Sequence, residues 1–342
     1  MQVTETPPPS LAAEKVQRLL RENYGIEGSL APLVSERDQN FRVDTGSGPA
    51  FVAKIANARE AGQVTEFQVE ALRHLERAGC PVTVPRVIPA RDGGFVTGFV
   101  SGGDRYRMRL VTWVPGSPLV GKQVHPPLAR SLGESLARID VGLSTFSHPG
   151  ERQELLWDMQ RALEVRDGTR HVRDRELRAR VRKCFDDFER NALPAFPVLR
   201  AQVIHNDLNP GNVLVTGGTS SRVAGVIDFG DMVRAPLVVD VAIAASYLRS
   251  DDADALAPAA ALVAGFGSVT PLGDDELSLV HGLMCTRLAT TIVMMYSRLS
   301  RQTADDAYLE KTLQSEGSAQ RFLAKLEAVT AGTFADRVRS SS

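Results

Sequence analysis

The amino-acid sequence predicts an α+β fold of two lobes, a small β-rich N-terminal lobe with one main helix and a larger, mostly helical C-terminal lobe. Three observations lead to this prediction. Short β-prone runs fill most of the first third of the chain, helical periodicity dominates the rest, and the turn-forming sequence VPGSP at 114–118 separates the two regions. At ~150 residues per domain, a chain of 342 residues also has room for about two domains.

The first lobe is expected to hold strands around one helix. The sequence TGSG at 45–48 is typical of a turn and places the second and third β-prone runs in a hairpin. Apolar residues then recur at helical spacing over 63–77, and Gly79 with Pro81 ends that pattern. The predicted strands are 30–35, 40–44, 51–55, 84–88, 95–100 and 106–111.

The second lobe is expected to be mostly helical. A middle region, 203–227, interrupts the helices with two short apolar runs and a further strand, and these frame a cluster of polar loops. The charged outer face of the helix at 177–188 is expected to be solvated. The predicted helices are 128–143, 177–188, 238–248, 255–266 and 276–299.

These elements divide the chain into four predicted regions. A lead-in with the first helix occupies 1–24, and the β-rich lobe, expected to bind a nucleotide, occupies 25–113. The helical lobe, expected to carry catalysis and the substrate, occupies 114–335, and 336–342 is predicted to be a disordered tail.

Composition excludes several classes of protein. Lys and Arg number 40 against 41 Asp and Glu, for a net charge of -1, so no nucleic-acid partner is expected. Cys80, Cys184 and Cys285 lack zinc-binding spacing, which indicates buried thiols in a reducing compartment. There is no signal-peptide pattern, and the apolar stretch at 288–295 is too short to cross a bilayer. We therefore expect a cytoplasmic protein with no membrane partner.

Two polar clusters follow apolar runs in the second lobe. The first, HNDLNPGN at 205–212, has the form HxDxxxxN, and the second is IDFGD at 227–231. Three fixed letters are a weak motif alone, whereas the pair is specific. Because each cluster follows an apolar run, Asp207, Asn212 and Asp228 are expected at strand ends, where loops project side chains into clefts.

These residue types suit phosphoryl transfer, in which catalysis consists of holding donor and acceptor in line and neutralising charge with Mg²⁺. Asp207 can accept or orient the proton of an acceptor hydroxyl, while Asn212 and Asp228 supply the hard oxygen ligands that Mg²⁺ prefers. The alternative is that all three are buried turn residues. His205 is expected to be structural, because an imidazole at a strand end more often bonds the backbone than moves a proton.

A single lysine lies in the apolar strand FVAKI at 51–55, which has a VAIK-like form. Lys54 can bind the α and β phosphates of a nucleotide. Such a lysine is more often an edge residue whose amine reaches solvent. Its position ahead of the HxDxxxxN loop favours the functional interpretation.

Together these motifs resemble the aminoglycoside phosphotransferase and choline kinase superfamily, small-molecule kinases with a protein-kinase-like fold. Asn209 replaces the lysine that protein kinases carry there, and no APE segment is present, which favours a small-molecule acceptor. Within the superfamily the chain looks most similar to hydroxylysine kinase and its bacterial relatives, over roughly residues 25–300. The similar segments are SERDQNF at 35–41, EFQ at 66–68, LVTWVPG at 110–116, WD at 157–158 and DFGDM at 228–232.

The resemblance implies roles for the matching positions. Lys54 would bind the phosphates of ATP or GTP, and Asp207 would be the catalytic base. Asn212 and Asp228 would hold Mg²⁺.

The resemblance also implies roles outside the two motifs. Thr112 and Val114 would offer backbone groups to the purine ring. Asp240, in the sequence PLVVDVAIAA, resembles the buried aspartate that supports the catalytic loop from a following helix. Its alternative is an acidic residue of the first helical turn, favoured there by the helix dipole.

The chain departs from the kinase pattern in two places. No GxGxxG lies between the first two strands, so Ser35, Gln39 and backbone amides are expected to cover the phosphates. The helix at 63–77 should present a glutamate to the strand lysine, but its glutamates lie off the apolar stripe. Gln68 lies at the centre of the stripe and is the predicted partner of Lys54, with Glu70 as the alternative.

The sequence thus predicts a magnesium-dependent kinase that moves the γ-phosphoryl group of ATP or GTP onto the hydroxyl of a small amine-bearing metabolite. Hydroxylysine is the preferred acceptor, and other amino alcohols, hydroxy amino acids and aminoglycoside-type antibiotics remain open. A catalytically silent kinase-fold binding module is the non-enzymatic alternative. Asp158, Glu154 and Asp231 can bind a cationic substrate, and Trp157 either stacks on its ammonium group or belongs to a helix core.

Overall fold

The structure is a computed structural model that describes residues 7–35, 37–217, 222–250, 252–300 and 307–341. The chain divides into two compact units. An antiparallel sheet dominates the first and helices dominate the second, which confirms the predicted α+β class. The first unit contains Met1–Gly116, Phe146–Gln153 and Ala224–Gly230, and the second contains Ser117–Thr145, Glu154–Val223 and Asp231–Ser342.

The first unit is built on a six-stranded sheet in the order β1-β2-β3-β6-β4, with β5 also paired to β6. The strand pairings within this sheet are antiparallel, and β2 and β3 form the hairpin that the sequence predicts. The elements of this unit are α1 (Ala13–Tyr24), β1 (Ser29–Leu33), β2 (Gln39–Thr45), β3 (Gly48–Ile55), α2 (Gly62–Arg77), β4 (Val87–Ile88), β5 (Thr97–Ser101), β6 (Asp104–Thr112) and a short 3₁₀ helix, η2 (Pro149–Arg152).

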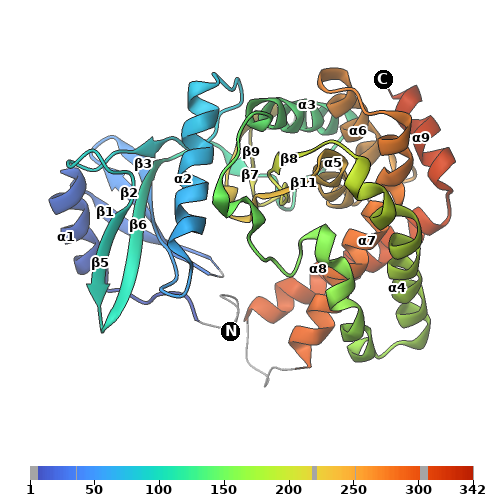
Figure 1. Ribbon diagram of the computed structural model, residues 1–342, viewed down its shortest axis with the longest axis horizontal. Helices are drawn as coiled ribbons and strands as arrows, with labels where there is room; N and C mark the ends of the chain where they lie inside the picture. Colours follow the sequence, from blue (N-terminus) through green and yellow to red (C-terminus); the bar gives the residue numbers. More distant parts are fainter. Residues whose placement is uncertain (1–6, 36, 218–221, 251, 301–306, 342) are drawn as a thin grey trace. The chain divides into compact units, whose positions relative to one another are not determined.

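Side chains alternate between the two faces of this sheet, as the two-residue period of a strand requires. Ala53 and Ile55 of β3 are buried in a hydrophobic core that α1 covers. Lys54 lies between them in sequence, so it projects from the other face, together with Arg109, its cross-strand neighbour on β6. Helix α2 packs on that second face, and α1 and α2 flank the sheet (Figure 1).

Helix α1 belongs to the first unit and is not a separate lead-in. Its residues Val16, Leu19 and Leu20 are buried against β2, β3 and β6. This result differs from the predicted region 1–24, because the amphipathic face of α1 completes the core of the sheet. The first six residues of that region lie outside the described part of the chain.

The second unit contains a two-stranded antiparallel sheet, β11-β8, surrounded by helices. Strands β8 and β11 contact α5 (Figure 1). The elements from residue 117 onward are β7 (Ser117–Pro118), α3 (Pro126–Leu143), η3 (Met159–His171), α4 (Arg175–Asp187), η4 (Phe188–Ala192), η5 (Leu193–Val198), β8 (Ala201–Ile204), β9 (Val213–Thr216), β10 (Arg222–Val226), η7 (Phe229–Asp231), β11 (Val233–Pro236), α5 (Leu237–Ser246), α6 (Ala257–Val269), α7 (Asp274–Leu299), α8 (Ala307–Glu327) and α9 (Ala331–Ser340).

Helix α7 is the long central helix of the second unit and contacts α4, α5, α8 and α9. It is the single described helix that is long and apolar enough to cross a membrane by length and composition, but 67% of its most apolar window is buried inside the protein. This burial is what a core helix shows. Both α5 and α6 are apolar on nearly all sides, and every residue of α5 is buried.

Two predicted boundaries differ from the structure. Residues 146–153 return to the first unit, because the rings of Phe146 and His148 stack with Phe67 of α2 at 5.8 and 5.7 Å between centroids. The predicted disordered tail at 336–342 is wrong as far as Ser341, since α9 runs to Ser340 and buries Val338. Ser342 lies outside the described residues.

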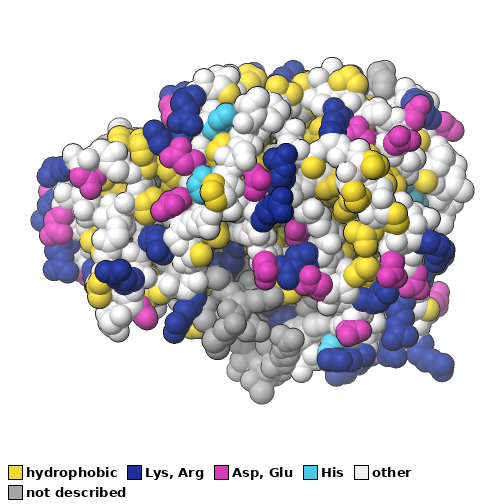
Figure 2. Space-filling view, in the orientation of Figure 1, with side chains coloured by type: hydrophobic (Ala, Val, Ile, Leu, Met, Phe, Trp, Pro, Cys, Tyr) yellow, Lys and Arg dark blue, Asp and Glu magenta, His cyan; other side chains and the backbone are white. Residues whose placement is uncertain are grey.

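The three cysteines are free thiols. Cys184 and Cys285 are buried as predicted, whereas Cys80 is half-buried. On the face shown in Figure 2, Lys and Arg side chains are interspersed with Asp and Glu, in keeping with the balanced composition.

Helices α3 and α6 approach each other through glycine. A Cβ atom on Gly133 would lie 1.9 Å from the carbonyl oxygen of Leu262, and one on Gly265 would lie 2.1 Å from that of Arg130. We expect Gly133→Ala to lower the free energy of unfolding by about 1–3 kcal/mol, because two backbones must separate to admit the methyl group. Chemical denaturation followed by circular dichroism measures this change.

Gly282→Ala is the matched control. Gly282 is also helical, on α7, but nothing lies within 4 Å of a Cβ placed there. Alanine forms helix better than glycine, so this variant should gain about 0.5–1 kcal/mol. Equal effects at the two positions would show that the α3–α6 contact is not tight.

Candidate active site

The loop that follows β8 is anchored from beneath by Asp240 of α5. The backbone N–H groups of His205 and Asn206 each donate to one Asp240 oxygen, at 2.8 Å. Asp240, His205 and Asn206 are all fully buried. His205 also accepts a hydrogen bond from the backbone N–H of Asp207 through Nδ1, at 3.3 Å, so its contacts hold the backbone of the loop.

A second buried carboxyl group, Asp140 of α3, faces Asp240. Neither Asp140 oxygen accepts a hydrogen bond from the described residues, and a proton on Asp140 would let one of them donate to Asp240. Burial raises the pKa of both carboxyls, and the Asp240 charge raises that of Asp140 further. The N–H donors around Asp240 favour its charged form, so Asp140 carries the proton.

Backbone strain occurs at two residues of the polar loops. Asn206 and Asp228 have φ values of 65° and 63°, the only non-glycine residues with positive φ in the described part of the chain. Asn and Asp tolerate this left-handed region better than other residues do. At Asn206 the Nδ2 group also donates to the carbonyl of Asp231 at 2.9 Å. Strain of this kind gathers at functional sites.

Asp207 lies among donors that orient its carboxylate. Asn209 and Asn212 donate from Nδ2 to Oδ2, at 2.7 and 3.1 Å. Oδ1 accepts from the hydroxyl of Tyr247 at 3.4 Å and from Arg287 at 3.3 Å. The side chain is 18% exposed, so it is held firmly and still reaches solvent.

Hydrogen bonds donated by its Nδ2 group fix the orientation of the Asn212 side chain. Its Nδ2 group donates to the carbonyl and to the carboxylate of Asp207, which leaves Oδ1 without a donor among the described residues. An amide oxygen is a hard neutral ligand and suits Mg²⁺. Asp228 is 52% exposed and supplies a carboxylate, so the donor types fit this ion. In the described ranges no three His, Cys, Asp or Glu side chains gather to hold a metal.

In the first unit, Lys54 pairs with Asp228. The Nζ group lies 3.3 Å from Oδ1, and the lysine side chain is 17% exposed. The predicted partnership with Gln68 is therefore wrong, and so is the alternative with Glu70, which pairs with Arg73. Gln68 instead accepts a hydrogen bond from Arg109.

The reason for this correction is the residue across the sheet from Lys54. Arg109 is that neighbour on β6 and is 3% exposed. The guanidinium of Arg109 takes the hydrogen bond with the Gln68 amide that was predicted for Lys54, and it also lies 3.4 Å from the Asp38 carboxylate. Sequence periodicity identified the central position of Gln68 but gave no indication of this competing cation.

The remaining predicted nucleotide contacts also lie in the first unit. The side-chain amide of Gln39 forms two hydrogen bonds with the backbone of Leu11: Oε1 accepts from the N–H at 2.8 Å, and Nε2 donates to the carbonyl at 2.9 Å. Gln39 therefore has a structural role in place of the predicted contact with nucleotide phosphates. Ser35 accepts from the N–H of Asp38 at 3.3 Å. The N–H of Thr112 donates to Arg86.

Val114 differs from these residues because its backbone is free. It is 4% exposed, and neither its N–H nor its C=O forms a hydrogen bond within the described ranges. Unpaired backbone groups of a buried residue fit the predicted contact to a purine ring.

The residues predicted to contact the substrate lie in the second unit. Asp158 is 5% exposed and caps η3 by accepting from the N–H of Gln160 at 3.0 Å, and burial raises its pKa. Trp157 is half-buried, and its carbonyl accepts from Arg287 at 2.8 Å. Asp231 is half-buried and follows the DFG residues of the second motif.

The structure therefore gathers the predicted residues into two sets. Asp207, Asn212, His205 and Asp240 belong together in the second unit, and Lys54 and Asp228 belong together in the first. Sequence reasoning missed Arg287, Tyr247 and Arg249 of the second unit. A charged residue inside an apolar helical run, LMCTRLATT at 283–291, was the available indication for Arg287.

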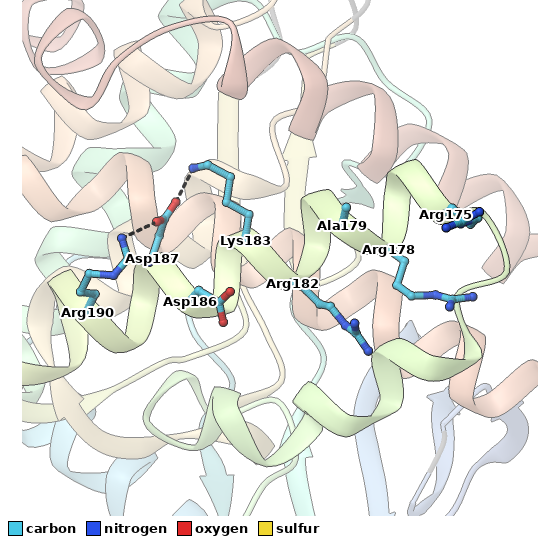
Figure 3. Close-up of a pocket in the computed structure, with 8 residues that line it drawn as sticks. All are labelled: Arg175, Arg178, Ala179, Arg182, Lys183, Asp186, Asp187 and Arg190. Atoms are coloured by element: carbon cyan, nitrogen blue, oxygen red, sulfur yellow. Dashed lines mark hydrogen bonds and ion pairs between the residues drawn. The ribbon is translucent and has the colours of Figure 1, made fainter.

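A separate pocket lies along the outer face of α4, and no predicted site residue lines it (Figure 3). Five of its eight lining residues are basic, but Lys183 and Arg190 pair with Asp187, which matches the predicted solvated face. The lining residues are Arg175, Arg178, Ala179, Arg182, Lys183, Asp186, Asp187 and Arg190.

Comparison with known proteins gives consistent results. The sequence profile described as the phosphotransferase enzyme family matches residues 29–277. The chain is 26% identical over 322 residues to a hydroxylysine kinase of Danio rerio, covering 90% of this chain and 89% of the relative. It is 30% identical over 255 residues to a homoserine kinase of Rhizobium johnstonii, covering 70% and 71%.

A solved structure described as a microcompartment-associated aminopropanol kinase superposes with a TM-score of 0.72 at 20% identity. The superposition covers 93% of this chain and 98% of that one. At this identity the likeness concerns the fold, and it confirms the predicted kinase-like architecture.

Proposed function

Because the chain belongs to the phosphotransferase enzyme family, we propose that this small-molecule kinase moves the γ-phosphoryl group of ATP or GTP onto the side-chain hydroxyl of a hydroxylated α-amino acid. Hydroxylysine is the preferred acceptor. The relatives named hydroxylysine kinase and homoserine kinase support this class, since both compounds are α-amino acids with a side-chain hydroxyl. The three free cysteines support a reducing, cytoplasmic location.

The observation that carries the proposal is the setting of Asp207. Its carboxylate is oriented by two asparagine side chains on a loop that a buried aspartate anchors, and it still reaches solvent. In the transfer, a bond forms between the acceptor oxygen and the γ-phosphorus while the bond from that phosphorus to the bridging oxygen breaks. The nucleoside diphosphate leaves, and the hydroxyl proton passes to Asp207.

The other residues have supporting roles. Lys54 would bind nucleotide phosphates, and the free backbone groups of Val114 would contact the purine. Asn212 and Asp228 would hold Mg²⁺, which when bound would neutralise charge on the phosphate oxygens. Asp158 and Asp231 would attract the ammonium group of the acceptor.

The test is a nucleotide-consumption assay with ATP and GTP against a panel of acceptors. The panel contains hydroxylysine, homoserine, 1-aminopropan-2-ol and kanamycin, and ³¹P NMR identifies the phosphomonoester product. We expect turnover that depends on a hydroxy amino acid. Turnover with kanamycin alone would identify an antibiotic kinase, and nucleotide binding without turnover of any acceptor would identify a silent binding module.

A further inference from the structure

The apolar helix α7 carries one buried guanidinium beside Asp207. Arg287 is 5% exposed, and its Nη1 group donates to the carbonyl of Trp157 at 2.8 Å. Its Nη2 group donates to the Tyr247 hydroxyl at 3.0 Å and to Oδ1 of Asp207 at 3.3 Å. Removing a guanidinium from water is unfavourable, so its presence at the centre of a core helix needs an explanation.

The donors of Arg287 are not all used. A guanidinium has five N–H donors in a planar fork that matches both oxygens of a carboxylate. The Nε–H of Arg287 is buried and has no hydrogen-bond partner within the described ranges. The contact with Asp207 involves one oxygen only, so it is not the two-bond pair that such a fork forms at its best. Buried donors without partners are rare in folded proteins.

A second cation shares the same aromatic ring. The guanidinium carbons of Arg249 and Arg287 lie 5.5 and 5.6 Å from the centroid of the Tyr247 ring. Burial lowers the pKa of Arg249 to about 10, and the charge of Arg287 contributes to that shift. The two guanidinium groups repel each other across the Tyr247 ring, and Asp207 contacts only that of Arg287, so a further anion near the ring would be attracted by both cations.

Anionic groups also act on Arg287. Asp158 and Asp231 interact electrostatically with it, in addition to Asp207. The surroundings of Asp207 in this unit thus contain charges of both signs. A zwitterion, which carries one carboxylate and one ammonium group on the same carbon, matches such surroundings. A phosphoryl group would need only the cations, and an amino alcohol would need only the anions.

We infer that Arg287 is a specificity-determining residue that binds the α-carboxylate of the acceptor, so that the enzyme selects hydroxy amino acids over the corresponding amino alcohols. This inference rests on the proposed function and adds to it the residue that recognises the α-carboxylate of the acceptor. Arg249 contributes further positive charge near the proposed position of this carboxylate.

The experiment compares acceptors that differ by one carboxylate. The pairs are 5-hydroxy-L-lysine with 1,5-diaminopentan-2-ol, and L-homoserine with 3-aminopropan-1-ol. The enzymes are the wild type, Arg287→Met, Arg287→Lys, which keeps the charge without the fork, and Arg298→Met as the matched control. Arg298 is exposed near the end of the same helix. Steady-state kinetics give kcat and KM separately for each acceptor.

For Arg287→Met we expect kcat/KM for the amino acid to fall on the order of 100-fold, mainly through KM, because a buried charge-assisted contact is lost. The amino alcohol should change little, Arg287→Lys should fall between, and Arg298→Met should match the wild type. An equal loss for both members of a pair would overturn the inference and indicate that Arg287 positions Asp207 or contacts the phosphoryl group.

Three other outcomes separate this inference from the proposed function. A preference for amino acids that survives in Arg287→Met would overturn the assignment of Arg287 and leave the proposed function standing. A wild type that turns over both members of each pair equally, or neither of them, would overturn the inference. Failure with every acceptor would overturn the proposed function as well.

Discussion

Asp207→Asn is expected to lower kcat by about 10²–10⁴-fold, because the amide keeps the shape of the side chain but cannot accept the hydroxyl proton. Lys54, Val114 and Asp228 belong to the other unit and remain unchanged, so nucleotide affinity should stay near the wild-type value. Single-turnover kinetics with hydroxylysine measure the chemical step, and calorimetric titration with a nonhydrolysable nucleotide measures binding.

The folded state of Asp207→Asn must be checked, because Arg287 loses the anion that it contacts. Circular dichroism and a denaturation curve supply this control. Asp207→Ala should show the same loss of phosphoryl transfer. Near-normal turnover in either variant would exclude Asp207 as the base.

Asp240→Ala is expected to lower the free energy of unfolding by about 3–5 kcal/mol, the range found when one partner of a buried charged network is removed. Two backbone N–H groups, those of His205 and Asn206, would lose their acceptor where no water reaches them. A protein of ordinary stability has about 5–15 kcal/mol in total, so this is a large fraction. Urea denaturation at pH 7 measures it, and activity should fall with the loss of the loop anchor.

Asp140→Asn is the matched control for Asp240→Ala. The raised pKa of Asp140 means that the folded protein binds a proton that the unfolded chain releases, so stability of the wild type falls as pH rises above the ordinary carboxyl range. Asparagine keeps a donor toward Asp240 and does not titrate. We expect this variant to be at least as stable as the wild type at pH 7, with an advantage that shrinks toward about pH 4.

One result would contradict the assignment of the shared proton to Asp140. If Asp140→Asn destabilises the protein as much as Asp240→Ala does, then Asp140 does not hold the shared proton. If Asp240→Ala does not fold, Asp240→Asn keeps one acceptor oxygen and should give an intermediate loss that can still be measured.

Local patterns were enough to predict most of the first unit. The β-prone runs and the TGSG turn predicted β2 and β3 within a few residues, and the apolar stripe predicted α2 to within one residue of its start. The same patterns could not predict that Phe146 and His148 return to α2, because a ring contact between distant segments leaves no periodicity in the sequence.

The candidate site was predictable where its residues share a short motif. The spacing of Asp207 and Asn212 places both on one loop, and the structure joins them by hydrogen bonds. Partners on other elements were not predictable in the same way. Gln68 was correctly placed as a buried residue of α2, but Arg109 takes its amide, and Arg287 reaches Asp207 from a helix 80 residues further along the chain.

The return of residues 146–153 to α2 also limits how this chain can be cut and recombined. A fragment ending at Gly116 would keep all six strands of the sheet but would leave the Phe67 ring without its aromatic neighbours. Chimaeras that exchange this lobe between relatives must therefore transplant three separate stretches of sequence. Splitting the gene only at the VPGSP turn, 114–118, would place Phe67 on one polypeptide and Phe146 and His148 on the other.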